Sequence, residues 1–252
     1  MTQPTIIECQ QYAPEWWAAR RGVPTASEFH RFAPVWPVRM TAKGEPHKGD
    51  LRDKADAMLN YAAQLVGDLY DPMYGQREDY ESAAMKNGGL MEPRVRAYYE
   101  LVTGEAVRQV GFVRSACGRW GCSPDGLVGE DGGLECKSPE CPEQVRVLLA
   151  GCLPAKHRAQ VHGCLIVTGR KWWDYVSHAD GMAAILRVRV EPDEYTDRLR
   201  ETLDAFAAIH ADVRSRIAAM VAEAGGVGAA TVESVARASD AAELERIEAT
   251  MF

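Results

Sequence analysis

Two carboxylates and an ammonium group lie near one another in the middle of the chain. Asp125 follows a Ser-Pro pair, Glu135 comes after a glycine-rich stretch, and Lys137 lies just beyond Glu135. Carboxylate, carbonyl and water oxygens are the ligands that Mg²⁺ prefers, and the backbone carbonyl of Cys136 is placed to complete the set. A lysine beside such an ion can orient and deprotonate an attacking water or stabilise charge on a pentavalent phosphate. These residue types therefore indicate metal-dependent hydrolysis of a phosphodiester.

A β-hairpin is the element expected to bring these residues together. A short apolar run leads into residues 129–133, Gly-Glu-Asp-Gly-Gly, which have turn chemistry, and a second strand leads out. Side chains alternate along a strand, so Glu135 and Lys137 share one face while Leu134 and Cys136 take the other. Polar residues on a strand pair more often mean only a solvated face. The flanking Pro-Asp-Gly and the glycine-rich turn favour the functional interpretation.

A third carboxylate, Glu92, lies on a neighbouring helix. Helical periodicity begins near Gln76, is interrupted by Asn87-Gly-Gly89, and restarts at Pro93 to stop at Gly104. From this restart Glu92 could reach the same ion or a second one. A glutamate near a helix N-terminus is, however, commonly only a favourable partner of the helix dipole.

Polar residues nearer the N-terminus could bind an anion. Arg20 ends a short expected helix that begins at Pro14, and Thr25 with Glu28 forms a capping box for the next helix. Arg20 could act as a bidentate phosphate clamp, with the hydroxyls of Thr25 and Ser27 at a helix N-terminus. A simple helix–turn–helix corner is the alternative interpretation.

The remaining patterns predict a mixed α/β chain. Helical spacing of apolar residues predicts helices over 50–68, 141–151, 154–168 and 192–224. Alternating apolar residues predict strands over 105–128, 171–178 and 184–191. Beyond residue 225 the composition shifts to Ala, Gly, Ser and acidic residues, so residues 225–252 are interpreted as a helical C-terminal accessory segment.

Composition limits the class of protein. The chain has 252 residues, 46% hydrophobic and 26% charged, which suits one globular domain with an appendage. The formal net charge of −7 argues against nonspecific coating of nucleic acid but allows a local basic groove. Cysteines number 7, which indicates reduced thiols in a cytosolic compartment. The sequence has neither the apolar run of roughly 20 residues that a membrane helix needs nor a signal-peptide pattern, so no membrane partner is expected.

Four cysteines form a competing pattern of two C-x₄-C pairs, Cys117 with Cys122 and Cys136 with Cys141. Structural zinc usually has two to four residues between paired ligands, so this spacing is marginal for zinc or an iron–sulfur cluster. Cys136 also faces away from Glu135 on its strand, where a free cysteine behaves as a small core residue.

Three separated motifs resemble a known nuclease family. Ser123-Pro-Asp-Gly-Leu followed by Leu134-Glu-Cys-Lys137 resembles the PD-(D/E)XK nuclease motif. Arg20-x-Gly-Val-x-Thr-Ala-Ser27 upstream and Ala159-Gln160-Val downstream are similar to the phage λ exonuclease family, whose members resect DNA ends processively. The motifs occur in the family's order, and the match runs from about residue 13 to residue 190.

The resemblance implies a fold and a role for each matching residue. The expected fold is a restriction-endonuclease-like α/β (α+β) core, a central mixed β-sheet flanked by helices, over residues 1–224. The resemblance implies that Asp125 and Glu135 are metal ligands, together with the Cys136 carbonyl, that Lys137 is the catalytic lysine, and that Glu92 is the helix carboxylate of the site. It also implies that the terminal 5′-phosphate or the scissile region is held by Arg20, Thr25, Ser27, Ser123 and Gln160.

The resemblance further implies an activity and partners. The expected enzyme is a Mg²⁺-dependent (Mn²⁺ as a substitute) 5′-to-3′ exodeoxyribonuclease that converts one strand of linear double-stranded DNA to 5′-mononucleotides. The family implies a toroidal homotrimer around duplex DNA, a single-strand-annealing recombinase as partner, and a phage or prophage protein in the cytoplasm of a bacterial host. A ring needs only a basic lining, for which the candidates are Lys43, Lys48, Lys156, Arg158 and Lys171. A structure-specific or restriction-type endonuclease on the same core, or a non-catalytic DNA-end-binding module, remain alternatives.

Overall fold

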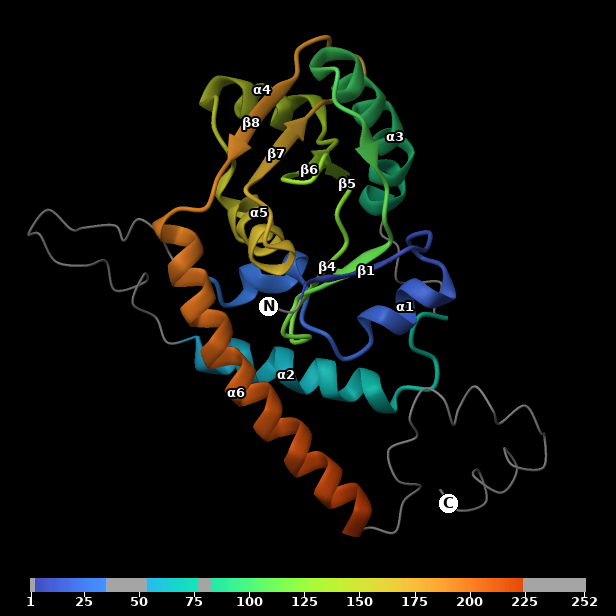
Figure 1. The fold of residues 1–252 in the computed structure, drawn as a ribbon, viewed down its shortest axis with the longest axis vertical. Coiled ribbons are helices and arrows are strands. Elements are labelled where there is room, and N and C mark those ends of the chain that lie inside the picture. Colours follow the sequence, from blue (N-terminus) through green and yellow to red (C-terminus); the bar gives the residue numbers. More distant parts are fainter. Residues whose placement is uncertain (1–2, 35–53, 77–82, 224–252) are drawn as a thin grey trace, which may run out of the picture.

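The predicted hairpin forms part of a five-stranded sheet (Figure 1). The structure is a computed structural model that describes residues 3–34, 54–76 and 83–223, without the side chains of residues 83–90. The helices in these ranges are α1 (Pro14–Arg20), the 3₁₀ helix η1 (Ala26–Arg31), α2 (Ala55–Tyr70), α3 (Ala83–Thr103), α4 (Cys141–Ala150), α5 (Ala155–Thr168) and α6 (Glu194–Glu223). The strands are β1 (Thr5–Ile7), β2 (Val107–Arg108), β3 (Phe112–Arg114), β4 (Gly121–Cys122), β5 (Gly126–Val128), β6 (Gly132–Lys137), β7 (Trp172–Ser177) and β8 (Leu186–Val190).

The five-stranded sheet is mixed, as the sequence predicts. Its strands have the order β2-β5-β6-β7-β8, and the hairpin register places Gly126 opposite Leu134. Strands β6 and β7 are parallel, because α4 and α5 connect them, whereas the other neighbouring pairs are antiparallel. A separate three-stranded sheet has the order β1-β3-β4, and α1 contacts its middle strand.

Helices cover both faces of the larger sheet. Helix α3 packs Val95 and Tyr99 against Leu134 and Cys136 of β6. Helix α5 contacts β7 on the other face, where Tyr175 belongs to the main core. The predicted alternation along β6 is therefore confirmed for its apolar residues, and its charged residues are left on the side of α5.

The main core lies between η1, α2, α5 and α6, and α2 crosses α6 below the sheet in Figure 1. The rings of Phe32 and Phe206 stack with centroids 4.6 Å apart, and Tyr61 stacks on Phe206 at 5.5 Å. Full burial of one such ring contributes roughly 1.5–3 kcal/mol. This packing holds η1, and the polar residues at its start, against α2.

Two features hold the hairpin turn in place. A Cβ atom at Gly133 would lie 2.2 Å from the buried ring of Trp173, so this close approach requires glycine. Arg170 Nη1 donates hydrogen bonds to carbonyls of the turn, at 2.9 Å to Gly129 and 2.6 Å to Gly132. These contacts stabilise the register, and the register decides which acidic side chains meet.

Helix α3 differs from the prediction. It is one continuous helix over Ala83–Thr103 with Pro93 inside, not an interrupted stretch that restarts at the proline. Residues 77–82, near the predicted start, lie outside the described ranges. An interior proline costs roughly 3 kcal/mol, and the packing of Val95 and Tyr99 against the sheet offsets that cost. Tertiary contacts therefore outweigh the local helix-breaking signal.

The segment after Arg20 also differs from the prediction. Residues Ala26–Arg31 form a 3₁₀ helix, and the Thr25 side chain makes no cap hydrogen bond to it. Glu28 forms an ion pair with Arg31 at 2.5 Å. The predicted capping box is therefore wrong, and the Thr25 hydroxyl is available for other partners.

The other predicted helices and strands occur near their expected positions, although the strand region over 105–128 forms four short strands, β2 to β5. Strand β1 was not predicted. The accessory segment over 225–252 and all of residues 35–53 lie outside the described ranges. Within those ranges, no helix combines the length and apolar character required to cross a bilayer.

Candidate active site

Asp125 and Glu135 face each other across the hairpin. Gly126 pairs with Leu134, so the residues one step beyond them along the two strands are Asp125 and Glu135. Glu135 is 1% exposed, and Asp125 is partly buried. The Asp125 Oδ2 atom accepts a hydrogen bond from the Cys136 N–H at 2.6 Å. The hairpin therefore brings the two acidic groups together, as its sequence predicts.

Glu135 forms a polar cluster with Lys137 and Gln160. Its Oε1 atom accepts a hydrogen bond from Gln160 Nε2 at 2.6 Å and pairs with Lys137 Nζ at 2.5 Å. Its Oε2 atom is buried and has no hydrogen-bond partner within the described part of the chain. Because Gln160 comes from α5, the structure joins the hairpin to the predicted downstream motif.

Burial and repulsion perturb the charged groups. Burial, followed by the Glu135 and Glu92 carboxylates, raises the pKa of Asp125 well above its usual value. Burial also raises the pKa of Glu135, although Lys137 partly offsets this effect. Burial lowers the pKa of Lys137, but Glu135 and Asp125 outweigh it, so the pKa is raised and the side chain is an ammonium. Asp125, Glu135, Glu92 and Lys137 are called the carboxylate site below. The three carboxylates concentrate negative charge in a confined space that favours a cation.

Glu92 reaches the carboxylate site from α3. Its Oε1 atom accepts a hydrogen bond from Arg96 Nη1 at 2.7 Å, and the same nitrogen donates to the Asp125 carbonyl at 2.6 Å. Arg96 is only 7% exposed. It was not predicted, because arginine is ordinarily assigned to solvent. The four-residue spacing from Glu92 is the signal that could have found it.

The donor set fits a hard divalent ion. Two carboxylates, Asp125 and Glu135, and the carbonyl of Cys136 are the kind of partial ligand set that Mg²⁺ takes while keeping several waters. The unpartnered, buried Oε2 of Glu135 is an acceptor that such an ion would satisfy. Across the described ranges, no cluster of three or more His, Cys, Asp or Glu side chains is arranged to hold a metal.

The four cysteines of the competing pattern do not converge. Cys122 belongs to the main core, whereas Cys136 packs with Val95 in the cluster under α3. Cys117 and Cys141 are exposed, and none of these residues is in a disulfide. The core placement predicted for Cys136 is confirmed.

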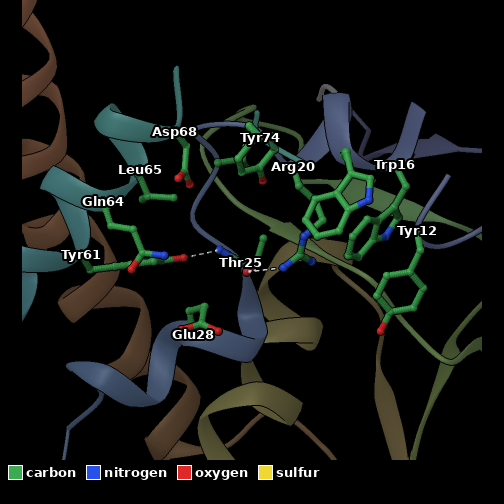
Figure 2. A pocket seen from close by; sticks show the side chains of 12 residues that line it. Tyr12, Trp16, Arg20, Thr25, Glu28, Tyr61, Gln64, Leu65, Asp68 and Tyr74 are labelled. Carbon is green, nitrogen blue, oxygen red and sulfur yellow. Dashed lines mark hydrogen bonds between the residues drawn. The ribbon is translucent and has the colours of Figure 1, made fainter. Parts of the chain in front are cut away.

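A second polar cluster surrounds Arg20 (Figure 2). Arg20 donates hydrogen bonds from Nη1 to Ser123 Oγ at 3.1 Å and from Nη2 to Thr25 Oγ1 at 3.4 Å. Thr25 Oγ1 lies 3.2 Å from Ser27 Oγ. The guanidinium stacks over Trp16, 4.4 Å from the ring centroid, and burial lowers the pKa of Arg20. Four predicted residues therefore meet here, and Arg20, Thr25, Ser27 and Ser123 are called the Arg20 pocket below.

A cavity of about 260 Å³ opens beside this cluster. In Figure 2, Arg20 and Thr25 lie in its middle, with Trp16 and Tyr12 on one side and Tyr61 on the other, and the carboxylates of Asp68 and Glu28 lie at its margin. Tyr61 of α2 also lines the cavity, and its hydroxyl accepts a hydrogen bond from the Thr25 N–H at 3.2 Å. The complete lining consists of Tyr12, Trp16, Trp17, Arg20, Val23, Thr25, Glu28, Tyr61, Gln64, Leu65, Asp68 and Tyr74.

One short segment connects the two clusters. Ser123 accepts hydrogen bonds from Arg20 and from Trp16 Nε1, the latter at 2.9 Å, and Asp125 lies just after it in the chain. The Ser-Pro-Asp motif therefore carries one residue of each cluster. The carboxylate site and the Arg20 pocket lie next to each other as a result.

The predicted basic lining is described only in part. Lys43 and Lys48 lie outside the described ranges. Lys156 pairs with Glu143 at 3.0 Å, and Lys171 pairs with Asp131 at 2.8 Å. Arg158 lies over the Tyr195 ring, 5.6 Å from its centroid. Their role toward DNA stays a prediction.

Comparisons with known proteins agree with the motifs. Residues 15–171 match the family model of the YqaJ-like viral recombinase domain. A solved complex of LHK-Exo with dAMP has 27% identity and a TM-score of 0.66, and the alignment covers 84% of this chain and 98% of that one. The alkaline exonuclease LHK-Exo from Laribacter hongkongensis, solved separately, has 28% identity and a TM-score of 0.61 over 82% and 100% of the two chains.

A more distant structure shares the fold alone. The phage-related exonuclease from Haemophilus somnus 129PT has 13% identity and a TM-score of 0.51, over 77% of this chain and 96% of that one. No curated protein sequence gives a significant match. The family model covers more than half of the chain and includes both clusters, and the resemblance to the λ exonuclease family is confirmed. The chain belongs to the YqaJ-like viral recombinase family.

Proposed function

We propose that this protein is a metal-dependent exodeoxyribonuclease that degrades the 5′-ended strand of linear double-stranded DNA. The products would be 5′-mononucleotides and a duplex with a 3′ single strand. The observation that carries the proposal is the adjacency of the carboxylate site and the Arg20 pocket, joined through Ser123 and Asp125. Family membership and the exonuclease relatives support it. LHK-Exo has been solved with dAMP, a 5′-mononucleotide, which fits the proposed product.

The carboxylate site would cleave the phosphodiester. Asp125, Glu135 and the Cys136 carbonyl would hold the ion, and the chemistry supplied by Mg²⁺, or Mn²⁺ in its place, is polarisation of the phosphate and activation of a water. Lys137 would orient that water and place positive charge beside the pentavalent phosphate. Gln160 would keep the Glu135 carboxylate in position through its hydrogen bond of 2.6 Å.

The Arg20 pocket would bind the terminal 5′-phosphate. Hydrolysis breaks the bond between phosphorus and the 3′ oxygen of the terminal nucleotide, which leaves with a 3′-hydroxyl. The phosphorus takes an oxygen from water and remains on the next nucleotide as the new 5′-phosphate of the strand. A guanidinium surrounded by the hydroxyls of Thr25, Ser27 and Ser123 suits that dianion. Binding of each new end would favour forward movement along the strand.

The resemblance to the λ exonuclease family also supports two further proposals, one on the assembly and one on the partner protein. A homotrimeric ring around the duplex would explain how an acidic chain remains on DNA, because a ring is retained by topology. A single-strand-annealing recombinase would take up the 3′ strand, in the cytoplasm of a bacterial host. Light scattering after size-exclusion chromatography tests the trimer directly.

A strand-labelled linear duplex tests the activity, its polarity and its dependence on ends together. We expect 5′-mononucleotides from the 5′-labelled strand in Mg²⁺, no products in EDTA, and recovery after Mg²⁺ or Mn²⁺ is added. The control substrate is a covalently closed plasmid, which should remain intact.

The same assay separates the alternatives. Nicking or linearisation of the closed plasmid would identify an endonuclease and contradict the end-dependent proposal. Binding of duplex ends without release of nucleotides in either metal would identify an end-binding module instead.

A further inference from the structure

Arg96 is a buried cation to which the proposed chemistry gives no role. It lies on α3 one turn after Glu92, and only 7% of its surface is exposed. A charged side chain in such a place requires compensating partners, because removing it from water is costly. The identity of those partners indicates what the residue does.

The Arg96 guanidinium contacts polar atoms on two sides, from its own helix and from two other segments. Nη1 donates to Glu92 Oε1 at 2.7 Å and to the Asp125 carbonyl at 2.6 Å. On the other side, the carboxamide oxygen of Gln109, when turned toward the guanidinium, accepts hydrogen bonds from Nη2 at 3.2 Å and from Nε at 3.1 Å. The planar fork of arginine can serve both sides at once, whereas the ammonium of a lysine cannot.

These contacts hold Asp125 and Glu92 relative to each other. The carboxylate of Asp125 is bound by β6 through the Cys136 N–H, and its carbonyl is bound by α3 through Arg96. One nitrogen of Arg96 binds both that carbonyl and the Glu92 carboxylate. A shift of α3 relative to the hairpin would therefore break at least one of these hydrogen bonds.

Arg96 also supplies positive charge where carboxylates crowd together. Glu135 pairs with Lys137, and Glu92 pairs with Arg96, so two of the three carboxylates have a cation of their own. The pairing orients Glu92 by a direct hydrogen bond.

We propose that Arg96 is a positioning residue of the carboxylate site. It sets the place and orientation of Glu92 relative to Asp125, and so determines how well the site binds a divalent ion. The inference rests on the proposed nuclease function, and it adds a residue that touches neither DNA nor metal.

The decisive variant is Arg96→Lys, which keeps the charge and loses the fork. Residues that orient metal-site groups typically contribute 10–100-fold to affinity or activity. We expect the Mn²⁺ dissociation constant, measured by electron paramagnetic resonance without DNA, to rise about 10-fold or more. We expect kcat to fall by about 10–100-fold with little change in KM for duplex ends. The matched control is Arg94→Lys on the same helix, because the Arg94 side chain is 71% exposed and lies 3.8 Å from Asp180.

A double-variant cycle tests whether Arg96 acts through Glu92. If it does, Arg96→Lys should add little to the loss of Mn²⁺ affinity already caused by Glu92→Gln. Fully additive losses of Mn²⁺ affinity would mean that Arg96 does not act through Glu92. Melting temperatures of all variants show whether any loss reflects unfolding. If Arg96→Lys does not fold, Gln109→Ala tests the inference instead, because Gln109 is exposed. We expect this variant to lose less Mn²⁺ affinity than Arg96→Lys would. An unchanged Mn²⁺ affinity would overturn the inference.

The outcomes for the two proposals are distinguishable. A wild-type protein without nuclease activity contradicts the proposed function, whereas Mn²⁺ affinity still reports on Arg96. An active wild type with Arg96→Lys indistinguishable from Arg94→Lys overturns the role of Arg96 alone.

Discussion

The carboxylate site and the Arg20 pocket are neighbours built in opposite ways. The carboxylate site is formed by the end of a hairpin in the five-stranded sheet, with Glu135 almost fully buried and bonded to α5 through Gln160. The Arg20 pocket is formed by the end of α1 and the start of a 3₁₀ helix, with hydroxyls of three side chains near one guanidinium. The first gathers negative charge, and the second gathers donors around a positive charge.

The difference teaches how a substrate could be oriented. A nucleic acid strand carries one phosphate per nucleotide. The carboxylate site favours a cation that would accompany a phosphate, whereas the Arg20 pocket favours the phosphate itself. In the proposed function, the carboxylate site would need an ion between itself and the phosphate, whereas the Arg20 pocket would bind a phosphate directly. Because Ser123 and Asp125 lie on one short segment, the two proposed phosphate positions would keep a constant separation. We therefore expect variants of the two clusters to affect different kinetic quantities.

The largest expected effect comes from Lys137→Ala in the carboxylate site. A group that acts on the transition state typically contributes 10²–10⁴-fold, so we expect kcat to fall by roughly 10³-fold. KM for duplex ends should change little, because the Arg20 pocket is intact. Single-turnover release of nucleotides from a labelled duplex measures the loss. Arg200→Ala is the control, since the Arg200 side chain is 53% exposed and pairs with Asp197 on the same helix. Wild-type activity in Lys137→Ala would contradict the proposal that Lys137 acts on the attacking water and the phosphate.

The next effect comes from Arg20→Ala and concerns discrimination between ends. Hydrogen bonds to charged groups contribute about 1.5–3 kcal/mol, which corresponds to roughly 10–100-fold. We expect the wild type to prefer 5′-phosphate over 5′-hydroxyl ends by about this factor and Arg20→Ala to show almost no preference. Rates on the two substrates, with Arg119→Ala as an exposed control paired with Asp204, provide the measurement. Equal rates of the wild type on the two substrates would contradict the proposal that the Arg20 pocket binds the terminal 5′-phosphate.

The two clusters also differ in how far their sequences predict them. The carboxylate site follows from local rules, because the two-residue period of a strand puts Glu135 with Lys137 and the glycine-rich turn sets the hairpin. In the Arg20 pocket, the capping-box pattern marked Thr25 but predicted the wrong geometry for its hydroxyl. The hydroxyl of Thr25 faces Arg20 instead of the helix end, since packing of η1 against α2 and α5 decides its direction.

Long-range partners were beyond local rules. The burial of Arg96 depends on Gln109 and on the Asp125 carbonyl, which are distant in the chain and carry no pattern that marks them. The continuity of α3 across Pro93 depends on packing against β6, which a local breaker signal does not contain. The sequence thus predicted which residue types meet, and the tertiary contacts determined their orientation.

The smallest expected effect comes from Trp16→Phe at the boundary between the clusters. Trp16 Nε1 and Arg20 Nη1 both donate to Ser123 Oγ, at 2.9 and 3.1 Å. Two donors use both lone pairs of a serine oxygen, so its O–H remains to donate to a phosphate. The substitution keeps a ring beneath Arg20 and removes one neutral hydrogen bond, which contributes about 0.5–1.5 kcal/mol. We expect the preference for 5′-phosphate ends to fall about threefold, with kcat on the preferred end nearly unchanged.

The same measurement shows whether Trp16 acts through Ser123. In a protein that already carries Ser123→Ala, the indole N–H has lost its acceptor, so Trp16→Phe should cause no further fall in end preference. An additional fall of the same size would mean that the ring of Trp16 supports Arg20 directly and that the Ser123 hydroxyl is not oriented by the indole. A fall in kcat instead of end preference would mean that the short segment carrying Ser123 and Asp125 transmits changes from the Arg20 pocket to the carboxylate site, and that the two clusters act as one.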